Sequence, residues 1–580
     1  MEEYTDDFIM ARASKWLEGG YDDETKKQVK YLIDNDLNEL KESFYTDLEF
    51  GTGGIRGIMG VGTNRMNIYT VGMATQGLAN YLIKAFPNQT VKVAVSHDCR
   101  HNSRTFAERV ADIFASNGFT VYLFDSLRPT PELSFAIREL GCQSGVMITA
   151  SHNPREYNGY KAYWADGAQV VAPHDKNIID EVSQIKDIAQ IKSGANPQNI
   201  ITLDDKFDDI YLDRIASLSL SPEAVAQNAD MRIVYTPIHG CGHRMVPEAL
   251  HRFGFRNIGT VAEQMVLDGD FPTVASPNPE ERDTMNMAIE QGIHEGADIV
   301  LATDPDADRI GIAVPDEDGN FVLLNGNQTC VLLTYYICRR WNDLQRLNGH
   351  QYIVKTIVTS DMVSDIANSF GVNHFECLTG FKYIASVIRQ QELLGEKYIG
   401  GGEESFGYLP EDFVRDKDGV SSCALAAEAA AWAKSNGMSL YRLIKELYVN
   451  YGFYKESLVS IVRKGIQGQE EIKQMMSDWR TSPPKIIAGS SVARINDFLT
   501  SESHDLTTDK VSHIDIEKSN VLQFITADKT KVSVRPSGTE PKIKFYFSVR
   551  EPLESVEDFD TVESRLDTKI LKIKQELGLM

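Results

Sequence analysis

The sequence predicts an α/β protein of four domains: three related α/β domains with mixed sheets, then a C-terminal α+β domain with an antiparallel sheet. Three observations indicate this. The chain of 580 residues is long enough for about three to five domains. Apolar strand-like runs alternate with helical segments over most of its length. After about residue 455, short alternating strands follow one another and end in a helix.

The first α/β unit follows a helical lead-in at residues 25–46, where apolar residues recur at helical spacing. Strands and helices then alternate at short intervals, which predicts a mostly parallel sheet with right-handed crossovers. The expected strands are 91–98, 119–125 and 144–153, and the expected helices are 105–118 and 130–141.

The same rhythm recurs twice. The second unit has expected strands at 231–240, 255–261 and 297–303, with helices near 245–253 and 284–296. A strand and a long helix near 319–350 lead to the third unit, with strands at 351–360 and 371–377 and helices at 361–370 and 383–394. The last domain has expected strands at 511–517, 521–528, 531–538 and 542–550. We therefore predict domains at 1–210, 211–325, 326–450 and 451–580.

Composition excludes several classes of function. The net charge is 59 − 83 = −24, and an acidic chain repels nucleic acid and anionic membranes. The seven cysteines are scattered and form no C-x-x-C pair, as expected of reduced thiols in a cytoplasmic protein. No signal-peptide pattern opens the sequence, and no apolar run reaches about 18 residues, so no membrane span is expected.

The stretch TASHNPREYNGYK (149–161) follows the third expected strand. In open α/β sheets, ligands lie beyond the carboxyl ends of strands, so Ser151 there is a candidate nucleophile with His152 beside it. The hydrolase elbow G-x-S-x-G does not match. The alternative is an ordinary turn, since Ser, Asn, Pro and Gly are turn formers, but the closing N-G-Y-K disfavours it.

The stretch ATDPDADRIG (302–311) places Asp304, Asp306 and Asp308 at alternate positions after a buried strand. Carboxylates this close repel one another unless a cation intervenes, and hard oxygen ligands favour Mg²⁺ or Ca²⁺. An EF-hand is excluded, because Arg309 and Pro315 occupy its glycine and glutamate positions. The alternative is a solvated acidic loop. Three carboxylates also leave coordination positions that a phosphate oxygen can fill.

The stretch GGEESFG (401–407) combines close backbone approach with a carboxylate and a hydroxyl, Glu403 and Ser405, a pair suited to two sugar hydroxyls. A helix N-cap or an ordinary turn is an equally weighted alternative. RDKDG (415–419) follows it. FGTGGIRG (50–57) matches neither a Rossmann fingerprint nor a P-loop, and predicts a flexible anion-facing loop with Arg56.

The stretch RPSGTEPKIK (535–544) predicts a phosphate cradle in the last domain. A guanidinium fork, two hydroxyls and exposed backbone N–H groups are the donors that phosphate prefers. As a lone motif, it is also compatible with a simple turn. The residues concerned are Arg535, Ser537, Gly538 and Thr539.

Together, the serine loop, the acidic loop, the sugar loop and the phosphate loop, in this order, resemble those of the α-D-phosphohexomutase superfamily, in its phosphoglucomutase/phosphomannomutase branch. The likeness spans residues 50 to about 545. It implies four domains around a central cleft, a phosphosugar substrate, no nucleic acid or membrane partner, and a monomer or weak homodimer. It also implies Mg²⁺ as cofactor and glucose 1,6-bisphosphate as activator and intermediate.

The resemblance also implies roles for individual residues. Ser151 would be a phosphoserine whose phosphate joins Asp304, Asp306 and Asp308 as a metal ligand. Lys161 would be a general acid/base, with Arg56, His152 and Arg309 lining the site and Lys417 a candidate second acid/base. The implied substrate-binding residues are Arg309, Thr379, Gly380, Lys382, Glu403, Ser405, Lys417, Arg535, Ser537, Gly538 and Thr539.

The implied activity is reversible conversion of α-D-glucose 1-phosphate and glucose 6-phosphate. Phe406 and Gly407 follow Ser405 where dual-specificity mannomutases typically have Gly-His, which favours glucose and removes a candidate acid/base histidine. A mannose or pentose phosphate, or synthesis of a sugar 1,6-bisphosphate, are alternatives with the same chemistry. A silent phosphosugar-binding protein and a phosphatase are the competing classes. His239, in TPIHG, either touches the site or is structural.

Overall fold

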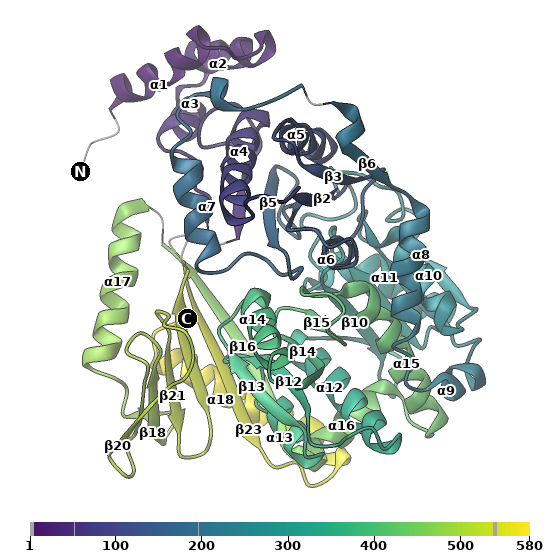
Figure 1. Cartoon of the computed structure of the whole chain (residues 1–580). Coiled ribbons are helices and arrows are strands. Elements are labelled where there is room, and N and C mark those ends of the chain that lie inside the picture. The colour runs from purple at the N-terminus through teal and green to yellow at the C-terminus, as the bar shows by residue number, and fades with distance from the viewer. Residues whose placement is uncertain (1–4, 52, 195, 464, 538–541, 580) are drawn as a thin grey trace. The chain divides into compact units, whose positions relative to one another are not determined.

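The computed structural model describes residues 5–51, 53–194, 196–463, 465–537 and 542–579 (Figure 1). The chain divides into two compact units. The first comprises Met1–Ala313 and Gly407–Glu428, and the second Val314–Phe406 and Ala429–Met580.

Three short helices open the first unit: α1 (Asp6–Glu18), α2 (Asp23–Asn35) and α3 (Leu37–Phe44). The predicted lead-in at 25–46 is therefore two helices: the first ends at Asp36, whose backbone leaves the helical conformation, and the Asp36 carboxylate caps the second by accepting the Glu39 N–H at 3.0 Å. The helices share a small apolar core in which Trp16 packs edge-on against Phe44 and Tyr69, the latter on α4 (Ile68–Ala85).

The first sheet has the strand order β1-β5-β4-β2-β3-β6. Strand β5 runs antiparallel to both of its neighbours, whereas the other pairs are parallel. Helices α4, α5 and α7 cover one face and α6 the other (Figure 1). The bounds are β1 (Gly54–Ile58), β2 (Lys92–His97), β3 (Thr120–Phe124), β4 (Ser144–Ile148), β5 (Tyr157–Trp164), β6 (Ile200–Leu203), α5 (Ser103–Ser116), α6 (Thr130–Glu139) and α7 (His174–Ser183).

Two predicted loops are strands instead. The expected flexible loop at 50–57 is wrong from Gly54 onward, since β1 pairs in register with β5. The close of the serine stretch also lies in β5. Glycine makes both strands possible: a Cβ on Gly54 would clash with the Tyr160 carbonyl, and one on Gly159 with the Thr149 carbonyl.

The second sheet of the first unit includes β10-β9-β7-β8 in that order, with β9 and β10 antiparallel and the others parallel. The β9–β10 turn carries the acidic loop. The bounds are β7 (Ile233–Thr236), β8 (Ile258–Thr260), β9 (Ile299–Thr303), β10 (Ile310–Pro315), α8 (Asp205–Ala216), α9 (Pro222–Gln227), α10 (Gly242–Phe253), α11 (Arg282–Glu295), β15 (Gly407–Leu409) and α15 (Gly419–Ser435).

The second unit contains a parallel sheet, β13-β12-β14, and an antiparallel sheet, β16-β23-β22-β21-β18-β19-β20. The bounds of the parallel sheet's strands are β12 (Gln351–Thr356), β13 (Asn373–Cys377) and β14 (Lys397–Glu403). The other elements of this part of the chain are β11 (Phe321–Leu324), α12 (Gly326–Asp343), α13 (Met362–Ser369), α14 (Phe381–Glu392) and α16 (Leu440–Tyr451). The bounds around the antiparallel sheet are β16 (Phe453–Val462), β17 (Ile486–Ile487), β18 (Ser490–Asp497), β19 (Glu502–Asp505), β20 (Lys510–His513), β21 (Leu522–Thr526), β22 (Lys531–Pro536), β23 (Lys542–Glu551), α17 (Gly465–Thr481) and α18 (Phe559–Glu576).

The predicted fold class is confirmed: α/β domains with mixed sheets precede a C-terminal antiparallel sheet with helices. The exact domain boundaries stay predictions. Among the elements that sequence reasoning missed are α1, α4, α7, α8, β14, α15, α16, β16, α17, β18 and β19. Within the part of the chain that the structure describes, no helix is long and apolar enough to cross a membrane.

Within the second unit, the parallel and antiparallel sheets are joined through a buried lysine. Lys355, whose side chain is fully buried, pairs with Glu376 at 2.6 Å and Asp361 at 2.9 Å. Lys531 of β22 pairs with the same Asp361 oxygen at 2.7 Å. The charges are therefore compensated where the two layers meet, which a buried ion pair requires.

Candidate active site

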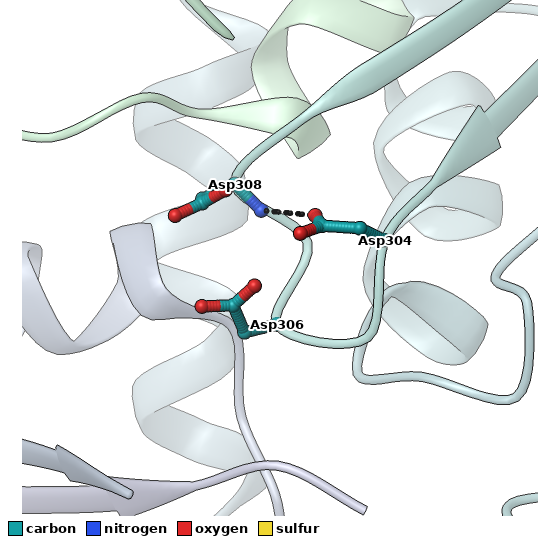
Figure 2. Close-up of side chains that lie close together, drawn as sticks. All are labelled: Asp304, Asp306 and Asp308. Atoms are coloured by element: carbon teal, nitrogen blue, oxygen red, sulfur yellow. Dashed lines mark hydrogen bonds between the residues drawn. The ribbon is translucent and has the colours of Figure 1, made fainter. Parts of the chain in front are cut away.

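The acidic loop is a buried turn between two antiparallel strands. Asp304, Asp306 and Asp308 are at most 1% exposed, and one carboxylate oxygen from each lies within 4.8 Å of the others (Figure 2). The Asp304 Oδ1 accepts the backbone N–H groups of Asp308 at 3.1 Å and Arg309 at 3.0 Å. These bonds fold the loop back on itself, which directs three carboxylates toward one point.

Ser151 lies against this loop. It follows β4 in a left-handed conformation, with φ of 53°, and its N–H donates to Thr149 Oγ1 at 2.8 Å. Its hydroxyl donates to Asp304 Oδ2 at 2.7 Å and lies 3.2 Å from His152 Nδ1. The structure thus brings the serine side chain into contact with the acidic triad, although 153 residues separate it from Asp304.

Two lysines approach the triad from other segments. Lys161 projects from β5 and donates to Asp306 Oδ2 at 2.7 Å and Asp308 Oδ2 at 3.1 Å. Lys417 lies 3.2 Å from the same Asp308 oxygen and 3.0 Å from Asp416 Oδ1. Both ammonium groups are therefore fixed by carboxylates, and both reach Oδ2 of Asp308.

Burial and neighbouring charge act differently on each group. Burial, reinforced by the other two carboxylates, raises the pKa of Asp304 well above its usual range. Burial also opposes ionisation of Asp308, but the ammonium groups of Lys161 and Lys417 hold its pKa below normal. Burial acts to lower the pKa of Lys161, and the Asp306 and Asp308 charges outweigh it and raise that pKa.

His152 is held neutral. Burial lowers its pKa well below the usual value, and the guanidinium groups of Arg309 and Arg56 lower it further. A neutral imidazole beside the serine hydroxyl can accept or donate one hydrogen bond, according to its tautomer.

The triad fits a divalent cation. Asp306 Oδ1 and Asp308 Oδ1 are buried and have no hydrogen-bond partner among the described residues, whereas their Oδ2 atoms accept from lysine. A buried carboxylate oxygen without a partner is costly, and a cation supplies the missing interaction. Hard oxygen donors that leave coordination positions open suit Mg²⁺. Asp304, Asp306 and Asp308 are the residues that could hold it.

One residue that sequence reasoning missed completes the triad's surroundings. Thr130, fully buried at the start of α6, donates its hydroxyl to Asp306 Oδ2 at 2.9 Å and its N–H to the Asp306 carbonyl, also at 2.9 Å. No local motif identifies it, since 176 residues separate the two in sequence.

The remaining predicted residues of the first unit differ in their contacts. Arg56 donates to Asn153 Oδ1 at 3.0 Å, within the serine loop. Arg309 pairs with Glu280. His239 is structural: its ring nitrogens lie 2.7 Å from the Val266 carbonyl and 2.9 Å from Thr273 Oγ1.

The predicted sugar-binding residues lie in the second unit. Glu403 ends β14, and its carboxylate accepts the Gly380 N–H at 2.7 Å, so these two predicted residues are brought together. Ser405 lies in the turn that follows β14, which makes this stretch a strand and turn, not a helix cap. The Thr379 hydroxyl is buried without a hydrogen-bond partner in the described structure. Lys382 stands 5.1 Å from the Tyr383 ring centroid.

Two predicted phosphate-binding residues are also in the second unit. Arg535 is on β22, and the Ser537 N–H donates to the Lys542 carbonyl at 2.7 Å. Gly538 and Thr539 lie outside the described residues. Tyr546, which was not predicted, lies near both Glu404 and Arg535. Burial and the Glu404 charge raise the pKa of Tyr546, while the Arg535 charge lowers it.

Comparison with known proteins identifies the class first. Models for alpha/beta/alpha domains I, II and III of phosphoglucomutase/phosphomannomutase match residues 47–189, 209–319 and 325–451. The fold and these matches define a mutase, an isomerase of the phosphotransferase type.

Individual relatives agree with this class. The phosphoglucomutase of Staphylococcus aureus strain MRSA252 is 37% identical over 546 residues, covering 93% of this chain and 96% of the relative. That of strain N315 is 36% identical over 559 residues, covering 96% and 98%. The chain therefore belongs to the phosphoglucomutase/phosphomannomutase family.

Solved structures support the fold. A putative phosphomannomutase from Thermus thermophilus superposes with a TM-score of 0.67 at 21% identity, covering 92% of this chain and 99% of that one. Parafusin from Paramecium, whose description includes phosphoglucomutase, also gives a TM-score of 0.67, at 17% identity, covering 92% and 96%.

Proposed function

We propose that this protein is a phosphoglucomutase. It interconverts α-D-glucose 1-phosphate and glucose 6-phosphate through a phosphoserine at Ser151 and a glucose 1,6-bisphosphate intermediate. The observation that carries the proposal is the position of the Ser151 hydroxyl, 2.7 Å from a carboxylate oxygen of Asp304. The other two members of this buried triad each have an oxygen that no described residue hydrogen-bonds. The family and the relatives named phosphoglucomutase support it.

Ser151 is the phosphate carrier in this proposal. Phosphate passes from Ser151 Oγ to a free hydroxyl of the monophosphate, so one P–O bond breaks as another forms. The bisphosphate then returns its other phosphate to Ser151. Such transfer needs positioning and neutralisation of charge, with little covalent assistance. Bound Mg²⁺, held by Asp304, Asp306 and Asp308, would supply electrostatic stabilisation of the phosphoryl oxygens.

Lys161 and Lys417 handle charge and protons. In each transfer, the attacking hydroxyl loses a proton and the leaving oxygen gains one. Lys161, kept protonated by Asp306 and Asp308, is suited to protonate Ser151 Oγ as it leaves. Lys417, anchored between Asp308 and Asp416, is the candidate for the second proton transfer.

The second unit contributes the groups that we assign to substrate. Glu403 and Ser405 bind sugar hydroxyls, and Lys382, Arg535 and Ser537 bind the phosphate that is not reacting. Thr379 and Gly380 adjoin Glu403, since the Gly380 N–H already fixes its carboxylate. The same phosphate-binding groups must bind either phosphate of the bisphosphate. Hydroxyl and N–H donors suit this better than a pocket shaped to one end of the sugar.

The experiment measures kcat/KM for glucose 1-phosphate, mannose 1-phosphate and ribose 1-phosphate, with Mg²⁺ and trace glucose 1,6-bisphosphate. A strong glucose preference supports phosphoglucomutase. Equal or greater activity on mannose or ribose would reassign the sugar and keep the mechanism.

A serine variant tests the carrier. Ser151→Ala should lose nearly all mutase activity while still binding sugar phosphate. Ser183→Ala is the matched control and should retain full activity, because Ser183 is an exposed serine at the end of α7 whose hydroxyl donates to the Asp180 carbonyl at 2.8 Å. Undiminished turnover by Ser151→Ala would reject the phosphoserine.

A further inference from the structure

A buried arginine lies beneath the Ser151 loop. Arg100 follows β2, is 3% exposed, and was not singled out by any sequence motif. Its guanidinium donates to the backbone carbonyl oxygens of four residues of one loop: Ser151 at 2.6 Å, Asn153, Pro154 at 2.8 Å and Tyr157 at 3.1 Å. We propose that Arg100 is the positioning residue that holds the Ser151 loop in the shape required for phosphoryl transfer.

The geometry uses both terminal nitrogens of the guanidinium. A guanidinium has five N–H donors in a fixed fork. Its Nη1 serves the carbonyls of Pro154 and Tyr157, and its Nη2 serves those of Ser151 and Asn153. Its Nε lies 3.2 Å from Asp98 Oδ2 in an ion pair, but the two atoms form no hydrogen bond, so the two terminal nitrogens alone donate to the loop. A lysine has one compact ammonium and cannot span four carbonyls.

The loop needs such a template because its own backbone does little to fix it. Inside it, the Asn153 N–H donates to the Ala150 carbonyl and the Tyr157 N–H to the Pro154 carbonyl, which are single turns. Ser151 also adopts φ of 53°, a conformation that costs a non-glycine residue about 1–2 kcal/mol. Converging carbonyl dipoles repel one another, and a guanidinium between them removes that repulsion.

Arg100 acts through geometry more than through charge. Asp98, whose side chain is fully buried, neutralises it. The Asp98 Oδ1 in turn accepts the Arg100 N–H at 2.9 Å and the Ser103 hydroxyl at 2.7 Å. The Phe271 ring lies 5.0 Å from the guanidinium carbon. Contacts with Asp98 and Phe271 therefore fix the position of the arginine, which it needs if it is to hold the serine loop rigidly.

The inference rests on the proposed role of Ser151 and predicts a specific kinetic defect. A displacement of about 1 Å in a catalytic group can reduce rate about 100-fold. We expect Arg100→Lys to slow kcat and the rate of Ser151 phosphorylation by glucose 1,6-bisphosphate roughly 10- to 100-fold. The KM for glucose 1-phosphate should change less than about threefold, because Arg100 contacts loop carbonyls and not substrate.

The test is rapid-quench phosphorylation of the dephosphorylated protein, read by intact mass, with steady-state kinetics alongside. Arg104→Lys is the matched control: its guanidinium also donates to backbone carbonyls, Phe124 at 3.0 Å and Asp125 at 2.9 Å, but not to the serine loop. Normal loading by Arg100→Lys, or equal slowing by both variants, would overturn the inference.

A milder variant covers the case in which Arg100→Lys does not fold. Phe271→Leu removes the ring that packs against the guanidinium, so Arg100 keeps its donors but is held less rigidly against the loop carbonyls. Loading slowed at least about threefold would support the inference, and unchanged loading would overturn it. If the unsubstituted protein never gains phosphate on Ser151, the proposed function fails instead, and the two failures are thereby distinguished.

Discussion

The hydroxyl of Thr130 offers a measurable test of how the acidic triad is oriented. Thr130→Val replaces the hydroxyl by a methyl group of the same shape in a fully buried position. Asp306 Oδ2 then keeps only its Lys161 donor, at 2.7 Å. The freed carboxylate can rotate, and the oxygen offered to a cation is no longer fixed. We therefore expect weaker Mg²⁺ binding in a protein that remains folded.

The magnitude follows from the contact. A hydrogen bond to a charged group contributes about 1.5–3 kcal/mol, and about 1.4 kcal/mol corresponds to a tenfold change in affinity. Because Lys161 still holds the same oxygen, the lower end applies, and the Mg²⁺ Kd should rise about tenfold. This agrees with the roughly 10- to 100-fold cost typical of outer-shell substitutions at metal sites.

The assay is calorimetric titration of the dephosphorylated protein with Mg²⁺, independent of turnover. Thr130→Ser, which keeps the hydroxyl, is the control and should bind within about twofold of the unsubstituted protein. Thermal melts establish that both variants are folded. The reasoning is refuted if Thr130→Val binds Mg²⁺ normally, or if Thr130→Ser is weakened as much.

Three further changes test the fold. Gly159→Ala should destabilise by about 1–3 kcal/mol, since its Cβ clashes with a neighbouring backbone carbonyl, whereas Gly51→Ala, whose Cβ meets nothing closer than 3.6 Å, should be nearly neutral in urea unfolding. Lys355→Met leaves Glu376, whose side chain is 40% exposed, without its ammonium partner while Asp361 keeps Lys531, and it should cost roughly 2–3 kcal/mol by the same measurement. Burial raises the pKa of Asp418 to about 6 in the folded protein, above its value in the unfolded chain. Protonated Asp418 therefore stabilises the fold at low pH, and this contribution is lost as the pH rises from about 4 to about 6. Asp418→Asn should remove this loss, and its unfolding free energy relative to the unsubstituted protein should rise by up to roughly 3 kcal/mol across that window; a pH-independent difference would contradict it.

The parts of the candidate site that were predictable from sequence are those whose residues lie close together in a single short motif. The acidic triad occupies alternate positions of a single turn, and Ser151 directly follows a strand, so residue type and spacing identify both. Lys161 was identified, but its strand was not, because Asn158-Gly159 resembles a turn. In the structure, the Asn158 side chain donates to the His101 carbonyl at 3.0 Å and Ser103 Oγ at 2.9 Å, contacts that no local pattern shows.

The fold was predictable where periodicity is strong and least where helices and strands are short or polar. The parallel strands of the α/β domains are nearly continuous apolar runs and were found. The outer strands of the last sheet are polar and exposed, as β20 is throughout its length, so they carry weak periodicity. The helix α17 lies after residue 455, where the sequence pattern changes, and before the first expected strand at 511–517. No element was predicted in that stretch.

The motif D-P-D-A-D gives three candidate ligands but not the oxygen that each one could offer a cation. That choice depends on outer donors from distant segments. Thr130 and Lys161 occupy Oδ2 of Asp306, and Lys161 and Lys417 occupy Oδ2 of Asp308. Each bond takes one oxygen and leaves Oδ1 for a cation. The oxygens left open to a cation are thus determined by three residues outside the triad, which is why a scan for ligand motifs finds the triad and still does not describe the site.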